Sequence, residues 1–248
     1  MDGGDWNTYY GNEAGRPTSI TLDLQYQQSG AIAFPTLVVL QLKLANPRQD
    51  GMPQGDEFNV VYGIEDRLLN LLSNSNNSRF VGHKFSAGMV KYFFYTSNSS
   101  AVAAAAAVIS VEFPGCQLDQ SIVQDVGWSV YRETLLPKGD DIQQMADNNV
   151  IQTLSVQGGD IHKPRIIDHY AYFSTTKDRE NFKKAILGEG FQIVKESLNT
   201  ASKAQWSIVF HRLDAPVTIT KATVELTHLA EQYSGDYDGW DSPVISKP

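Results

Sequence analysis

Alternation of apolar and polar residues predicts a strand near the start of the chain. Apolar side chains occupy every second position between Ile20 and Tyr26, which is the period of a half-buried strand over residues 18–26. Residues 36–44 are more continuously apolar, as expected of a strand at the centre of a sheet. Residues 56–72 instead repeat with the helical period, because Val61, Ile64 and Leu68 fall on one face.

The same patterns continue through the first half of the chain and predict a β-β-α-β-β-α-β order. The elements are strands 18–26 and 36–44, a helix at 56–72, a hairpin of strands 79–86 and 89–96, an Ala-rich helix ending near 112, and a strand at 116–123. Residues 125–136 show no clear period and are expected to form an irregular tail.

A polar, turn-forming stretch at residues 137–141 predicts a domain boundary, with one domain at 1–138 and another at 139–248. The expected elements of the second domain are a helix at 141–157, strand 165–173, helix 177–187, strands 191–198 and 206–213, helix 217–233 and an edge strand at 237–245. After its first helix this is the split βαβ order of a ferredoxin-like fold. The first domain has the same order with one extra strand. We therefore predict an α+β protein of two ferredoxin-like α/β sandwich domains, with antiparallel sheets and helices on one face.

Charge and composition narrow the classes of partner. The 248 residues contain 28 acidic and 20 basic side chains, for a formal net charge of -8, which favours a basic protein partner and argues against direct nucleic-acid binding. Cys116 is the only cysteine, so no intrachain disulfide or thiolate metal cluster can form. The N-terminus lacks signal-peptide features, and the longest apolar stretch, 101–111, is too short to span a membrane. We expect a cytoplasmic protein that makes no contact with a membrane.

The sequence contains none of the common catalytic motifs: no Gly-rich phosphate loop, no His-Glu-x-x-His, no Cys-x-x-Cys and no Gly-x-Ser-x-Gly. We therefore expect no enzyme, no cofactor and no bound metal. One alternative is a metal-assisted hydrolase, with His169 and His211 on adjacent strands and Asp160 or Asp168 nearby. The competing interpretation is that both are hydrogen-bonded strand histidines. A small-molecule sensor is a further alternative.

Two clusters combine carboxylates with large aromatic side chains. The first is Asp125, Trp128 and Tyr131, and the second is Asp236, Tyr237, Asp238, Gly239 and Trp240. Aromatic residues with a polar atom are frequent anchors in protein interfaces, so the second cluster is a candidate partner-binding site. Together with Asp241 its carboxylates also suit a hard cation. The alternative is a turn after the last helix, with Trp240 packed back on the sheet.

Several motifs of the second half are similar to those of one known family. They are Pro-Arg-Ile-Ile-Asp-His-Tyr-Ala-Tyr-Phe at 164–173, Phe182 followed by Gly-Phe at 190–191, Leu-Ala-Glu at 229–231 and Gly-Asp-Tyr-Asp-Gly-Trp at 235–240. With them, residues 141–248 resemble the bacterial regulator of ribonuclease activity B (RraB) family. The resemblance implies a ferredoxin-like sandwich that binds an endoribonuclease of the RNA-degradation machinery and restrains it without catalysis. The acidic balance of this chain suits a basic segment of such a partner. His169 lies inside the matching motif and joins the candidate partner-binding residues.

The first half resembles a companion domain family of unknown function (a DUF-type family). The cues are Trp6 and Tyr9, Asp-Gly-Met-Pro at 50–53, Gly82, the cluster of Asp125, Trp128 and Tyr131, and Leu-Pro at 136–137. Because the function of that family is unknown, the resemblance predicts no particular activity for this half. The whole chain is thus expected to be a regulatory protein-interaction module.

Overall fold

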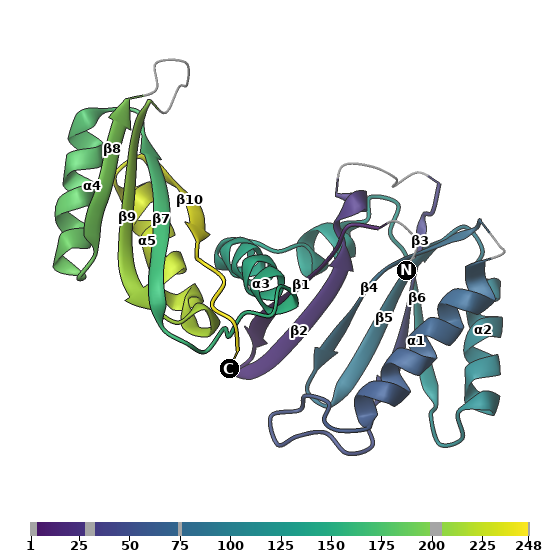
Figure 1. Ribbon diagram of the computed structural model, residues 1–248. Coiled ribbons are helices and arrows are strands. Elements are labelled where there is room, and N and C mark those ends of the chain that lie inside the picture. Colours follow the sequence, from purple (N-terminus) through teal and green to yellow (C-terminus); the bar gives the residue numbers. More distant parts are fainter. Residues whose placement is uncertain (1–3, 28–32, 74–75, 199–204, 248) are drawn as a thin grey trace. The chain divides into compact units, whose positions relative to one another are not determined.

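The computed structural model describes residues 4–27, 33–73, 76–198 and 205–247. The chain divides into two compact units, Met1–Lys138 and Gly139–Pro248. Both are α+β and each is built on one antiparallel sheet, as predicted (Figure 1). Within the described part of the chain, no helix has both the length and the apolar composition needed to cross a bilayer.

The N-terminal unit has a six-stranded sheet in the order β1-β2-β4-β5-β3-β6. The strands are β1 (Trp6–Glu13), β2 (Arg16–Asp23), β3 (Thr36–Lys43), β4 (Ser78–Ser86), β5 (Met89–Thr96) and β6 (Leu118–Gln124). With helices α1 (Glu57–Ser73) and α2 (Ser99–Glu112), the last four strands form the split βαβ arrangement, because its first and third strands, β3 and β5, lie together in the centre.

The prediction of one extra strand is wrong, because two strands, β1 and β2, precede this arrangement. β1 shows no simple alternation: Trp6 and Tyr10 face one side of the sheet while the buried Tyr9 faces the other. The predicted strand 18–26 begins earlier and ends at Asp23, and Leu24–Tyr26 form a 3-10 turn, η1. β2 joins the sheet along β4 at Gly82, where any side chain would meet the Thr21 carbonyl oxygen.

Helices α1 and α2 pack on one face of this sheet over an apolar core (Figure 1). The core takes the alternate residues Val38, Leu40 and Leu42 of the central strand β3, and the helical stripe of Val61, Ile64, Leu68 and Leu72 of α1. Burial of these side chains follows the periods of two and 3.6 in the sequence. Local patterning therefore accounts for this layer.

The opposite face of the sheet is covered in part, which corrects the expectation that only one face is packed. Residues 125–136, predicted to be an irregular tail, include a short π-helix, η2 (Tyr131–Leu135). The Trp128 ring stacks on Tyr95 with 4.1 Å between ring centroids, and the Tyr9 hydroxyl donates to the Leu135 carbonyl over 2.9 Å. This segment is thus a third layer, which has no helical or strand period to reveal it.

The C-terminal unit has a four-stranded sheet in the order β10-β7-β9-β8. Its elements are α3 (Asp140–Val156), β7 (Arg165–Phe173), α4 (Thr176–Gly188), β8 (Gln192–Leu198), β9 (Trp206–Asp214), α5 (Thr220–Gln232) and β10 (Gly235–Asp241). This is the predicted ferredoxin-like order without extra strands. The strand β10 lies at the edge, as expected, but ends at Asp241 and not at residue 245. A separate turn, η3 (Pro216–Thr218), precedes α5.

Candidate functional site

The cluster at residues 236–240 lies on strand β10, where the backbone separates its acidic from its aromatic side chains. A β-bulge between Tyr237 and Gly239 inserts one extra residue opposite β7. Tyr237 and Trp240 therefore face the same side although they are three positions apart, and both are buried, with 7% and 6% of their surface exposed. Asp236 and Asp238 are exposed.

Trp240 is held from inside the domain by a buried carboxylate. Its indole Nε1 donates to Oδ1 of Asp147 over 2.9 Å, and Asp147 of α3 is fully buried. The Thr223 hydroxyl of α5 donates to the other carboxylate oxygen over 2.5 Å. Trp240 thus joins β10 to two helices, and a partner would meet its exposed acidic neighbours before its ring.

His169 is also buried, among aromatic rings. Its ring stacks on Phe210 at 5.5 Å between centroids, and its Nδ1 lies 2.8 Å from the Tyr237 hydroxyl. Burial, with a smaller contribution from the nearby Arg212 charge, lowers the pKa of His169 to about 3. The imidazole is therefore neutral near pH 7 and is sealed from any partner at the surface.

His169 and His211 lie on opposite faces of the sheet, so they form no common site. In the antiparallel pairing, His169 is opposite Phe210 and His211 is opposite Asp168. The His211 Nδ1 lies 3.4 Å from Oδ1 of Asp168, on the face away from His169. Among the described residues, no three or more His, Cys, Asp or Glu side chains are grouped to hold a metal ion.

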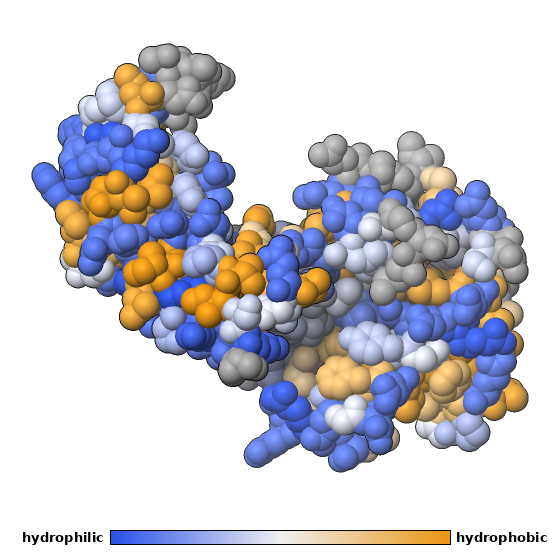
Figure 2. Space-filling model, in the orientation of Figure 1, coloured by the Kyte–Doolittle hydropathy of each residue, from blue (hydrophilic) through white to orange (hydrophobic). Residues whose placement is uncertain are grey.

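The face of this sheet opposite helices α4 and α5 carries acidic and phenolic side chains. We call it the acidic sheet face, and its residues are Asp168, Tyr170, Tyr172, Asp236 and Asp241. The Tyr170 hydroxyl donates to Oδ2 of Asp241 over 2.7 Å, and this hydrogen bond is the main cause that raises the pKa of Tyr170 to about 12. Exposed apolar residues, including Ile166 and Leu213, lie on the same side. Figure 2 shows hydrophobic residues among hydrophilic ones on the visible surface of this unit.

The first aromatic–acidic cluster is a buried hydrogen-bond network that attaches residues 125–136 to the sheet. Asp125 accepts from the Tyr95 hydroxyl over 2.6 Å and from the backbone of Ser129 and Val130. Burial alone raises the pKa of this carboxyl, but the hydrogen bonds outweigh burial and hold the pKa below its ordinary value. Trp128 and Tyr131 are fully buried, and their polar atoms donate to backbone carbonyls. These three residues expose little surface to a partner.

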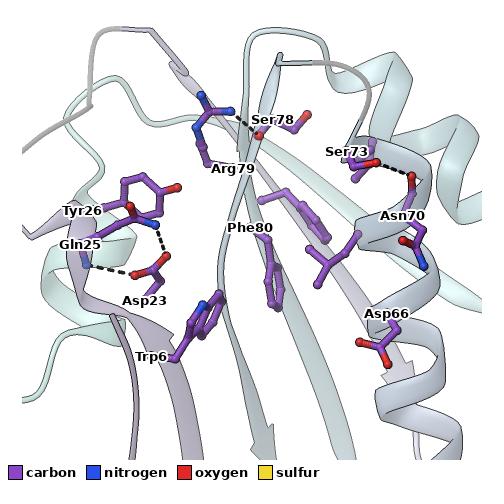
Figure 3. A pocket seen from close by; sticks show the side chains of 13 residues that line it. Trp6, Asp23, Gln25, Tyr26, Asp66, Asn70, Ser73, Ser78, Arg79 and Phe80 are labelled. Atoms are coloured by element: carbon purple, nitrogen blue, oxygen red, sulfur yellow. Dashed lines mark hydrogen bonds between the residues drawn. The ribbon is translucent and has the colours of Figure 1, made fainter. Parts of the chain in front are cut away.

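A pocket of about 490 Å³ lies between helix α1 and the added strands β1 and β2 of the N-terminal unit (Figure 3). Its floor includes Trp6 and Phe80, whose rings stack 5.5 Å apart between centroids. One wall is formed by the end of β2 and by η1, and the other by α1. The polar side chains that line it are Asp23, Gln25, Tyr26, Asp66, Asn70, Ser73, Ser78 and Arg79. Sequence reasoning missed this pocket, because none of its polar side chains belongs to a motif of the sequence analysis.

Asp23 is the most buried polar residue of the pocket, with 2% of its surface exposed. Its carboxylate accepts from the backbone N–H of Asp5 over 2.9 Å and from the backbone and side chain of Gln25. All of these donors are uncharged. Within the described part of the chain, no Lys, Arg or His forms an ion pair with Asp23.

Comparison with known families divides the chain at the same place as the structure. Residues 4–136 match the family of unknown function DUF695, and residues 144–242 match the regulator of ribonuclease activity B. No curated protein matches the chain. A crystal structure provisionally described as a glycine cleavage system transcriptional repressor is 13% identical and covers 84% of this chain and 98% of its own, with a TM-score of 0.25. An unknown protein from Galdieria sulphuraria is 11% identical and covers 84% of this chain and 99% of its own, with a TM-score of 0.22.

Both resemblances seen in the sequence are thereby confirmed. The N-terminal match spans the complete six-stranded sheet and the segment that covers its second face, and the C-terminal match runs from α3 to β10. The chain belongs to the DUF695 family of unknown function, and after that domain residues 144–242 match the regulator of ribonuclease activity B.

Proposed function

We propose that the protein is a non-catalytic regulator whose C-terminal domain binds another protein through the acidic sheet face. The observation that carries this proposal is the position of the acidic side chains. In the domain that matches a regulator family, Asp168, Asp236 and Asp241 share one face of the sheet, and the helices pack on the other. An antiparallel sheet with one polar face is an ordinary way to present a binding surface.

The charge on this face suits a basic partner segment. Asp236, Asp238 and Asp241 are exposed within six residues of the edge strand β10, and Asp168 lies directly opposite Asp241 on β7. Complementary charges of this kind mainly accelerate association and select partners. An endoribonuclease, or another RNA-processing protein with an Arg- or Lys-rich segment, is the partner that we propose, with the cytoplasm as the compartment.

The remaining candidate partner-binding residues lie on the buried face of the same sheet and stabilise the strands that carry the acidic side chains. The bulge at Gly239 and the buried side chains of Tyr237, Trp240 and His169 hold β10 against β7 and the helices. We propose that they position the acidic residues and that the partner contacts the carboxylates themselves.

The test is whether the protein slows RNA cleavage by a purified endoribonuclease from the same organism. The triple variant Asp236→Asn, Asp238→Asn, Asp241→Asn should associate about tenfold more slowly and lose much of its salt sensitivity. A matched control, Glu189→Gln, Glu225→Gln, Glu231→Gln, removes the same charge from exposed positions in helix α5 and at the end of helix α4 of the same unit. Equal effects of the two triple variants, or no binding by the wild type, would refute the proposal.

A further inference from the structure

The pocket beside helix α1 is a product of the two strands that the N-terminal unit adds to its ferredoxin-like arrangement. Strands β1 and β2 extend the sheet beyond β4 and contribute Trp6 and Asp23. Helix α1 borders this extension with Asp66, Asn70 and Ser73 (Figure 3). The result is a hollow with an aromatic floor and polar walls, and it takes no part in the function proposed for the other unit.

The aromatic floor offers ring faces that attract positive charge. Trp6 stacks on Phe80 with 30° between the ring planes, and Tyr26 packs against the buried Trp128 at 5.5 Å between centroids. Trp6 and Tyr26, two of the four aromatic residues that line the pocket, are therefore held by neighbouring aromatic side chains. A cation over the face of an aromatic ring is attracted by the negative potential of the ring, most strongly for tryptophan.

Two carboxylates line the same hollow from different elements. Asp23 at the end of β2 is almost fully buried, and among the described residues the donors to its carboxylate, the backbone N–H of Asp5 and the backbone and side-chain amides of Gln25, are uncharged. Asp66 lines the pocket from α1 and is exposed. The ionised form of a buried carboxylate is stabilised when a positive charge approaches it, because low-dielectric surroundings strengthen the attraction between the two charges.

Arg79 is the cationic side chain among the lining residues, and its guanidinium is already occupied. It lies over the Phe34 ring at 4.5 Å from the ring centroid and donates to the Ser78 carbonyl and to Oδ1 of Asn76. Figure 3 shows it at the opposite end of the pocket from Trp6 and Asp66. Trp6 and Asp66 therefore lie away from this positive charge, and the two carboxylates outnumber it among the lining residues.

We propose that this pocket binds an organic cation, whose positive charge is attracted by the carboxylates on its two walls, Asp23 and Asp66, and whose apolar part lies over Trp6. The volume of about 490 Å³ falls in the range of small-molecule sites. It admits either a free amine or the arginine or lysine side chain of a peptide with its flanking backbone. The shared chemistry is a positive charge on an apolar stem.

Calorimetric titration of the full-length protein distinguishes the two sources. The probes are agmatine and spermidine as free cations, and the blocked tripeptide Ala-Arg-Ala as the peptide source. The same tripeptide with citrulline in place of arginine is the neutral control. Binding of a free cation identifies a small-molecule site, whereas binding of the arginine peptide alone identifies a peptide site. The citrulline peptide should bind at least about tenfold more weakly, the scale of a charge-assisted hydrogen bond.

Two variants connect binding to the pocket. Asp66→Asn should reduce the affinity for the cationic probe by about tenfold. Asp119→Asn removes the same charge from an exposed position on β6, at the opposite edge of the sheet, and should bind as the wild type does. Trp6→Phe keeps an aromatic ring, so binding should persist while the ligand-induced change in tryptophan fluorescence is lost.

Three outcomes would overturn the proposal: no probe binds at millimolar concentration, the citrulline peptide binds as well as the arginine peptide, or Asp66→Asn and Asp119→Asn have equal effects. Thermal unfolding of each variant shows that a loss of binding is not a loss of fold. None of these outcomes depends on an endoribonuclease, so the two proposals stand or fail separately.

Discussion

Asp147 is a fully buried carboxylate that joins three elements of the C-terminal unit. It accepts hydrogen bonds from Trp240 of β10, Thr223 of α5 and Gln143 of its own helix. A buried charge is costly unless its hydrogen bonds are satisfied, and here three side-chain donors supply them. The Tyr-Asp-Gly-Trp segment is therefore stabilised from within the domain, and its tryptophan contributes to folding.

Truncation of this tryptophan should reduce stability without a direct effect on binding. We expect Trp240→Phe to lower the free energy of unfolding by about 1–3 kcal/mol, because Asp147 loses a donor while most of the packing remains. Trp240→Ala should cost about 3 kcal/mol or more. Urea unfolding measures both.

Trp206→Phe is the matched control, because that indole is only half-buried, and it should cost less than about 1 kcal/mol. A stable Trp240→Phe protein that no longer associates with its partner would show instead that the ring makes a binding contact.

His169 predicts a pH dependence with a definite sign. Its pKa in the folded protein is about 3, whereas the unfolded chain has an ordinary value of about 6.5. The unfolded state therefore takes up a proton first, so the stabilisation is complete above about pH 6.5 and is lost as the pH falls toward 3. Between pH 7 and pH 5 the expected loss is about 2 kcal/mol.

Replacement of the buried pair should remove this dependence. In the double variant His169→Phe, Tyr237→Phe, both polar partners become apolar, and stability should change little between pH 7 and pH 5. His211→Gln alters a partly exposed histidine on the opposite face and should retain the wild-type slope. Denaturant unfolding at the two pH values measures both, and an unchanged slope in the double variant would contradict the assignment.

At the scale of elements, residues 125–136 show how a segment without a period can still be tightly packed. Three of its hydrogen bonds reach strand β5 or the chain before β3: Tyr95 to Asp125, Tyr131 N–H to the Tyr95 hydroxyl, and Trp128 to Phe34. Trp128 has a positive φ of 55°, an uncommon conformation for a large side chain, and its ring packing compensates for it. Side-chain contacts therefore hold this layer in place.

Asp125→Asn should loosen this layer selectively. The amide loses part of the acceptor capacity that serves Tyr95, Ser129 and Val130, so we expect a loss of about 1–3 kcal/mol. Hydrogen exchange over residues 125–136 should accelerate, while α1 and α2 remain protected. Asp119→Asn on the exposed strand β6 is the control. Equal acceleration across the whole N-terminal unit would show that the segment unfolds only with the sheet.

At the scale of the whole molecule, the chain contains the ferredoxin-like arrangement twice. The central strands are β3 and β5 in one unit and β7 and β9 in the other, and each sheet follows the same order around them. The N-terminal unit adds the hairpin β1–β2 and the layer of residues 125–136. The C-terminal unit adds only α3, whose Leu154 packs with Ile167 and Trp240. The same ferredoxin-like arrangement is therefore extended by different elements in the two units.

The C-terminal unit should fold without the rest of the chain, because its sheet and helices enclose their own core. Residues 139–248 expressed alone should give one cooperative thermal transition by circular dichroism and resist limited proteolysis. A fragment that starts at residue 158, and so lacks α3, is the informative comparison. It should lose most of this stability, because Asp147 and Leu154 are removed. A molten 139–248 fragment would place the folding boundary elsewhere.

Local patterning of the sequence was sufficient for most of the secondary structure and for the order of elements. The strands β5 and β7 coincide with their predicted bounds, and α1 and α4 differ by one residue at each end. The reason is that an apolar period of two or 3.6 can be recognised within a short run of consecutive residues, without knowledge of distant contacts. The alternation of apolar and polar residues did not predict β1, because both of its faces are used, one by the pocket and one by residues 125–136.

The sites, in contrast, depended on contacts between residues far apart in the chain. The bulge opposite β7 turned Tyr237 and Trp240 inward and left Asp236 and Asp238 outside, and the register of β7 with β9 separated His169 from His211. The pocket needs Trp6, Asp23, Asp66 and Arg79 from four different elements. Which side chains meet is determined by strand register and by the packing of layers, and these arise only when distant segments bury their apolar surface against one another.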